Sequence, residues 1–132
     1  MPFMASTPKM AAVRWTPAEA ELEGLTSERA RDLIVTCFFE AQRETLARAR
    51  MRMGRAPDLD TVRRDVETIV RSTFTESGFD YDAPTSPALV LVVTALAKKA
   101  QSWGTPKDIV LHHLQSIRRI LARLGLQPTA EL

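Results

Sequence analysis

Two adjacent histidines, His112 and His113, are the side chains of this 132-residue chain best suited to acid–base chemistry near neutral pH. Neighbouring residues of a helix point about 100° apart, and only His113 falls on the apolar side of its segment. We therefore interpret His113 as a neutral histidine, hydrogen-bonded within the core or at an interface. His112 follows Asp108 by one helical turn, so these two residues could transfer a proton or share a metal ion. Asp108 and His112 form the site expected if the protein is a small hydrolase or transferase.

The metal-binding motifs of helical proteins are missing from the sequence. A di-iron or di-manganese bundle requires Glu-x-x-His on two of its helices, and this pattern does not occur. Cys37 is the only cysteine, which excludes zinc sites built from paired cysteines and predicts a small buried core residue. Glu76, Asp80 and Asp82 surround a turn, but the spacing of a calcium loop and its final glutamate are missing. We predict no cofactor, and we favour a protein that is not an enzyme.

The strongest charge feature is a basic segment, residues 43–64, which contains seven arginines and three acidic residues. On a helix Arg48, Arg52 and Arg55 lie on one face, where they could bind an anion, a nucleic acid or an acidic protein. The simpler interpretation is a solvated helix end, because the helix dipole favours arginine there. The whole chain has a net charge of +2, which permits an anionic partner without requiring one.

A helix-turn-helix motif is matched only in part by residues 96–114. Ala100, Gly104 and Val110 have the residue types that the motif requires at their positions, whereas Lys99, Thr105 and His113 do not. Nucleic-acid binding through this hairpin and the basic segment is therefore the alternative function.

Helices must position all of these residues, because apolar side chains recur at i, i+3 and i+4 along most of the chain. Thr-Pro or Ser-Pro pairs mark where helices begin, and glycines mark where they end, so these residues divide the chain into separate helical segments. The expected caps are Thr16, Thr26 or Ser27, Asp58 or Asp60, and Thr105. We predict an all-α fold, a compact bundle of four main helices at about 26–53, 58–77, 86–103 and 105–124, preceded by a short N-terminal helix at 17–23. Residues 1–15 are expected to be a mobile or loosely docked arm, residues 16–126 a single domain, and residues 127–132 a tail.

Residues 88–97 form the most apolar stretch of the chain. Their β-branched side chains would suit a buried strand, but the Ser-Pro start and the lack of a partner strand favour a helix. A helix that is apolar nearly all round is buried on most sides. We therefore predict that this helix is central, and that Leu91 and Val92 are less exposed than Arg63 and Arg71.

A second apolar row on the longest helix predicts an interface. Phe39, Leu46 and Met53 recur every seven residues, beside the row that faces the core. A small bundle has few inward positions left for them, and large apolar patches on a surface mark interaction sites. We predict a helical interaction or assembly module that binds copies of itself or another protein, unless the N-terminal arm covers the row.

The composition agrees with a protein that functions in the cytoplasm. The single cysteine indicates a reducing compartment, and no apolar run has the length of a signal peptide or of a membrane span. We therefore expect no membrane partner.

Overall fold

The computed structural model of the chain describes residues 14–53 and 58–126, with the side chains of residues 50–53 left undescribed. Within these ranges the chain forms five helices, and the predicted all-α fold is confirmed. They are α2 (Glu19–Leu22), α3 (Ser27–Met53), α4 (Leu59–Glu76), α5 (Ser86–Ser102) and α6 (Lys107–Arg123).

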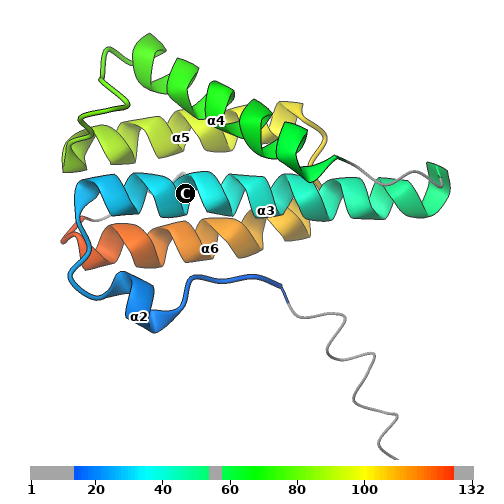
Figure 1. Ribbon diagram of the computed structural model, residues 1–132, viewed down its shortest axis with the longest axis horizontal. Coiled ribbons are helices and arrows are strands. Elements are labelled where there is room, and N and C mark those ends of the chain that lie inside the picture. The colour runs from blue at the N-terminus through cyan, green and yellow to red at the C-terminus, as the bar shows by residue number, and fades with distance from the viewer. Residues whose placement is uncertain (1–13, 54–57, 127–132) are drawn as a thin grey trace, which may run out of the picture.

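The four long helices form an up-down-up-down bundle (Figure 1). Successive helices run in opposite directions and pack against each other, as the short connections predict, and α6 returns against α3. α3 contacts α4, α5 and α6, and its C-terminal end projects beyond the other helices (Figure 1). The 27-residue α3 is therefore the central element of the bundle.

The predicted central position of residues 88–97 is wrong. Val92 is only 1% exposed, but Leu91 is 56% exposed, against 45% and 52% for the side chains of Arg63 and Arg71. The helices that cover α5 all lie on one side of it, so its opposite face remains in water although that face carries an apolar residue. Helix formation was predicted correctly, and burial all round was not.

Two of the predicted helix caps are confirmed by hydrogen bonds. The Thr26 hydroxyl accepts the backbone N–H of Arg29 at 3.1 Å. The Asp58 carboxylate accepts the backbone N–H of Asp60 at 3.2 Å. Each bond satisfies an N–H group that the first helical turn leaves without an intrahelical acceptor.

The predicted caps at Thr16 and Thr105 are not formed. α2 begins later, and there the Glu21 carboxylate accepts the backbone N–H of Ala18 at 3.0 Å. The Thr105 hydroxyl is buried without a hydrogen-bond partner in the described part of the chain. In both cases a proline follows the threonine, and the helix starts only after that proline.

Residues 14–25, called the strap below, lie along the outside of α6 (Figure 1). Leu22 and Pro17 are buried, and Trp15 and Leu25 are half-buried against the core. The Glu19 carboxylate accepts hydrogen bonds from two arginines near the end of α6, Arg119 and Arg123. Residues 14 and 15 of the predicted arm are thus docked, and the rest of the arm and the predicted tail, residues 127–132, lie outside the described residues.

Paired substitutions on α5 test the asymmetry of its burial. Leu96 is fully buried, so Leu96→Ala is expected to lower the free energy of unfolding by about 2–5 kcal/mol through lost contacts and a new cavity. Leu91→Ala makes the same change on the exposed face and should cost at most about 0.5 kcal/mol. Urea denaturation followed by circular dichroism measures both values. Equal losses would contradict the one-sided burial of α5.

Candidate functional site between the strap, α3 and α6

A cluster of charged side chains joins the strap, α3 and α6. Asp108, at the start of α6, accepts hydrogen bonds from Arg48 Nη2 and Arg14 Nη2, each at 2.6 Å. Glu44 of α3 accepts a third bond from Arg14 Nε at 2.8 Å. The hydrogen bonds from Arg48 and then from Arg14 hold the pKa of the Asp108 carboxyl far below its ordinary value. These groups neutralise one another and fasten the strap to the bundle.

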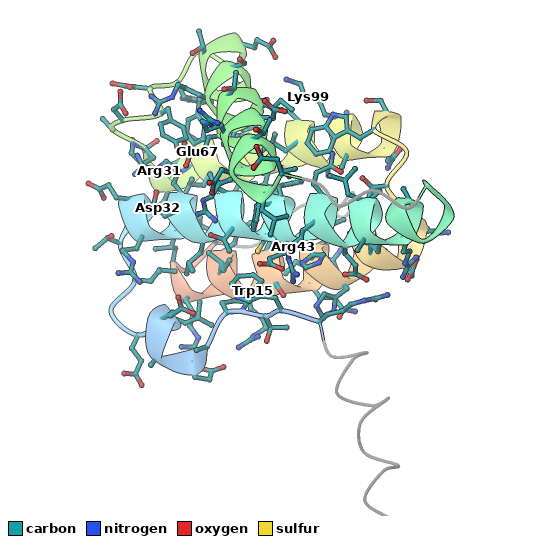
Figure 2. All side chains as sticks on the ribbon, turned by 45° about the vertical axis from the view of Figure 1, so that its right-hand side comes forward. Trp15, Arg31, Asp32, Arg43, Glu67 and Lys99 are labelled. Carbon is teal, nitrogen blue, oxygen red and sulfur yellow. The ribbon has the colours of Figure 1, made fainter. Side chains whose placement is uncertain are left out.

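The two members of the candidate acid–base pair have different partners. Asp108 is occupied by the two guanidinium groups, whereas His112 Nε2 lies 3.1 Å from the backbone oxygen of Trp15 and can donate to it. Figure 2 shows Trp15 beneath α3, where the strap passes along the bundle. His112 therefore holds the backbone of the strap, and Asp108 holds its arginine.

His113 is buried between α3 and α6, with only 3% of its surface exposed. The predicted position in the core is therefore confirmed, and burial and the neighbouring His112 ring lower the pKa of His113 to about 4, which favours the neutral ring. The predicted hydrogen bond is not formed among the described residues: His113 Nε2 lies 3.7 Å from Glu44 Oε1, and neither ring nitrogen has a hydrogen-bond partner there. Arg14 donates to the other oxygen of the same Glu44 carboxylate at 2.8 Å.

The imidazole of His113 and the hydroxyl of Thr105 line one small cavity between α3, α5 and α6. Its volume of about 10 Å³ corresponds to a single water molecule, and its other walls are apolar. A substrate pocket is usually tens of times larger. The cavity therefore offers no room for catalysis at His113.

A wider and open hollow of about 490 Å³ lies at the turn after α4. The Tyr81 ring lines it, and the guanidinium carbons of Arg31 and Arg71 lie 4.6 and 4.1 Å from the centroid of that ring. Figure 2 labels Arg31 beside Asp32, its ion-pair partner at 3.0 Å. These contacts are cation–π and ionic, and they hold the turn against α3 and α4.

The three acidic residues near this hollow each have a partner. Glu76 pairs with Lys99 at 2.9 Å, Asp82 pairs with Arg71 at 3.3 Å, and Asp80 accepts the backbone N–H of Asp82. Over residues 14–53 and 58–126, no three metal-ligating side chains gather where they could hold an ion.

The residues of the predicted interface row have different environments. Phe39 is half-buried against α4, where the guanidinium carbon of Arg63 lies 5.2 Å from the centroid of its ring. Leu46 is half-buried further along α3, and the side chain of Met53 lies outside the described residues. The second apolar row therefore serves, in part, the contact between α3 and α4.

The predicted anion patch is described only at Arg48. Its guanidinium is paired with Asp108 at 2.6 Å and with Glu44 at 3.5 Å. The side chain of Arg52 and the whole of Arg55 lie outside the described residues. The positive charge of Arg48 is therefore neutralised by two carboxylates of the same chain.

Sequence reasoning missed Arg14 and Glu44, which complete the charged cluster. Arg14 lies 94 positions before Asp108 and 30 before Glu44, and no local spacing rule connects residues so far apart. The high number of arginines in the sequence indicates that ion pairs form, but it does not show which carboxylates they contact.

Comparison of the chain with models of known protein families, with curated proteins and with solved structures gave no match. In the described ranges, no helix combines the length and the apolar character needed to cross a membrane.

The buried His113 predicts a specific dependence of stability on pH. The unfolded chain binds a proton near pH 6.5, whereas the folded chain binds it only near pH 4. The stability due to the neutral ring is therefore complete above pH 6.5 and is lost as the pH falls toward 4, by roughly 3 kcal/mol. Urea denaturation between pH 7 and pH 5 should show a much smaller loss for His113→Leu. His112→Gln should reduce the slope only in part, because burial is the larger cause of the lowered His113 pKa. Equal slopes in the wild type and His113→Leu would refute the assignment.

Cys37 provides an independent measure of how tightly α3 is packed. It is fully buried, and burial raises the pKa of its thiol far above the ordinary value. We expect dithionitrobenzoate at pH 8 to react with the native protein more than about a hundredfold more slowly than with the urea-unfolded chain. Rapid labelling of the native protein would show that α3 is less well packed than described.

Proposed function

We propose that this chain is a non-enzymatic helical interaction module that assembles with copies of itself through α3 and α4. The observation that carries the proposal is Leu59, a large apolar residue that is 42% exposed at the start of α4. Leu59 lies one helical turn before Arg63, the residue that covers Phe39. The exposed leucine therefore extends the apolar row that the sequence indicated as an interface.

The antiparallel packing of α3 and α4 brings Leu59 and Leu46 toward the same end of this surface. From the contact between Phe39 and Arg63, Leu46 lies two turns further along α3, and Leu59 lies one turn back along α4. Because the two helices run in opposite directions, both steps lead the same way (Figure 1). We call the surface formed by Phe39, Leu46 and Leu59 the α3–α4 face.

The charges around the α3–α4 face have both signs. Arg43 pairs with Glu40 at 2.6 Å, and Arg63 lies 4.0 Å from Glu67. A surface of mixed charge can meet its own copy without net repulsion across a twofold axis, which is the commonest symmetry of homo-oligomers. The strap lies along α6 and does not cover the α3–α4 face (Figure 1).

The histidine and carboxylate groups support a non-enzymatic role. Asp108 is occupied by two arginines, His112 lies against the strap backbone, and the cavity at His113 holds about one water molecule. None of these groups lines the hollow of about 490 Å³ at the turn after α4.

Nucleic-acid binding has less support from the geometry. Arg48 is ion-paired within the chain, and Lys99 of the partial helix-turn-helix motif donates to Thr73 and Glu76. α5 and α6 run in opposite directions in Figure 1, whereas helix-turn-helix pairs cross at about 90–120°. A mobility-shift titration at low salt tests this alternative directly.

We also propose that the protein functions in the cytoplasm. The buried free thiol of Cys37 supports this location, because such a thiol is stable in a reducing compartment. Cell fractionation with a tagged chain tests it, and recovery in an oxidising compartment would contradict it.

Light scattering coupled to size exclusion tests the proposed assembly. At micromolar concentration the wild type should exceed the 14.7 kDa mass of one chain. Leu59→Glu places a charge in the α3–α4 face and should lower the mass to that of one chain while circular dichroism retains its helical signal. Leu46→Glu should do the same.

Leu111→Glu is the matched control, because Leu111 is 51% exposed on α6, away from this face. It should leave the assembly intact. A wild-type protein that remains a monomer would refute the proposed self-association.

A further inference from the structure

The outer side of the α5–α6 hairpin carries two exposed leucines. Leu91 of α5 is 56% exposed and Leu111 of α6 is 51% exposed, and the two helices pack against each other. Single exposed leucines are common on protein surfaces, so their surroundings decide whether they mark a site.

Apolar residues lie between these two leucines: Val90 and Leu114 are half-buried and Ala97 is buried. Ala97 and Leu114 line the same cavity, which shows where α5 and α6 meet. Val90 lies two turns before Ala97 on the same side of α5, next to Leu91, and Leu111 lies one turn before Leu114. An apolar strip therefore crosses the junction of the two helices, and we call it the α5–α6 face.

The charges at the edges of the α5–α6 face are all positive. Lys98 lies two turns after Leu91 on the same side of α5, and Lys107 and Arg118 extend the row of Leu111 in both directions. All three cations are exposed, and no carboxylate within the described ranges pairs with them.

The acidic residues near the hairpin lie elsewhere. α5 contains no acid, and the one acid of α6, Asp108, is turned toward Arg14 and Arg48. The neighbouring cations Lys99 and Arg119 are already neutralised by Glu76 and Glu19. The α5–α6 face is thus apolar along its middle, and the positive charges at its edges have no carboxylate partner among the described residues.

These features point to one kind of partner. A second copy of the same face would bring like charges together across a twofold axis. A membrane would require an apolar helix face free to insert, but the apolar stripes of α5 and α6 are buried in the core. A nucleic acid would meet leucines at the centre of the site, where it needs polar groups or cations.

We propose that the α5–α6 face binds an amphipathic helix of a partner protein. The apolar side of that helix contacts Leu91 and Leu111, and acidic residues on its flanks pair with Lys98, Lys107 and Arg118. Recognition of this type uses apolar residues spaced at i, i+3 or i+4, and i+7 in the partner. The site is separate from the α3–α4 face, so it does not depend on self-association.

Fluorescence anisotropy with a synthetic probe tests the proposal on the full chain. The probe is a labelled peptide of three heptads with leucine on one side and glutamate on its flanks. It should bind, and a peptide with lysine in place of every glutamate should bind at least about tenfold more weakly. Vesicles of phosphatidylserine and duplex DNA should not compete with the probe. Equal binding of the two peptides, or displacement by either competitor, would overturn the proposal.

Substitutions then locate the site. Leu91→Ser with Leu111→Ser, and separately Lys98→Glu with Arg118→Glu, should each weaken binding of the acidic peptide by at least about tenfold. All four positions are exposed, so the helical circular dichroism signal should be unchanged. Leu59→Ser is the matched control, because it changes a similarly exposed leucine on the α3–α4 face.

The Leu59 variant should bind the acidic peptide like the wild type, whatever its state of association. Loss of binding in this variant alone would assign the peptide to the α3–α4 face and overturn the proposal. Failure of self-association would leave the expected peptide binding unchanged, so the two proposals can fail separately.

Discussion

Burial of α3 against three other helices is the constraint on which the rest of the structure depends. Ala30, Ile34 and Cys37 of α3 are at most 2% exposed, and Phe38 forms an edge-to-face contact with Trp103 at the end of α5. Transfer of such apolar surface out of water is the main favourable contribution to folding. Because α4, α5 and α6 all pack against α3, their positions depend on which sides of α3 are apolar.

The ion pairs have a different role from the core. Surface ion pairs contribute at most about 1 kcal/mol each, so they add little to the total stability of the bundle. They do fix the position of the strap: Arg14 bonds to Glu44 of α3, Trp15 O lies 3.1 Å from His112 of α6, and Glu19 bonds to Arg119 of α6. The strap covers apolar surface with Trp15 and Leu22, and its polar contacts determine where it lies. Beneath it, burial of His113 between α3 and α6 disfavours the charged form of its ring.

The two proposed binding surfaces differ in their electrostatics. Mixed charges surround the α3–α4 face, so it is compatible with its own copy, whereas only cations border the α5–α6 face, so it favours an acidic partner. Both surfaces arise from the same cause. A bundle of four helices covers one side of each helix, and any apolar residue on the other side remains in water.

The sequence by itself determined the helices, because their signals are local. Periodicity predicted each helix to within a few residues, and the caps at Thr26 and Asp58 act within one turn of their own position. Burial of Cys37 and of His113 followed from the apolar side of each helix.

Only the tertiary structure decided how the helices are placed and which charges meet. Residues 88–97 are apolar on every side, so no periodicity could show that Leu91 faces water, and α3 rather than α5 took the centre. The pairing of Arg14 with Asp108 joins residues 94 positions apart, and the sequence contains many arginines and carboxylates that could have paired instead. Such long-range choices depend on how whole helices pack, whereas local rules act only over one or two turns.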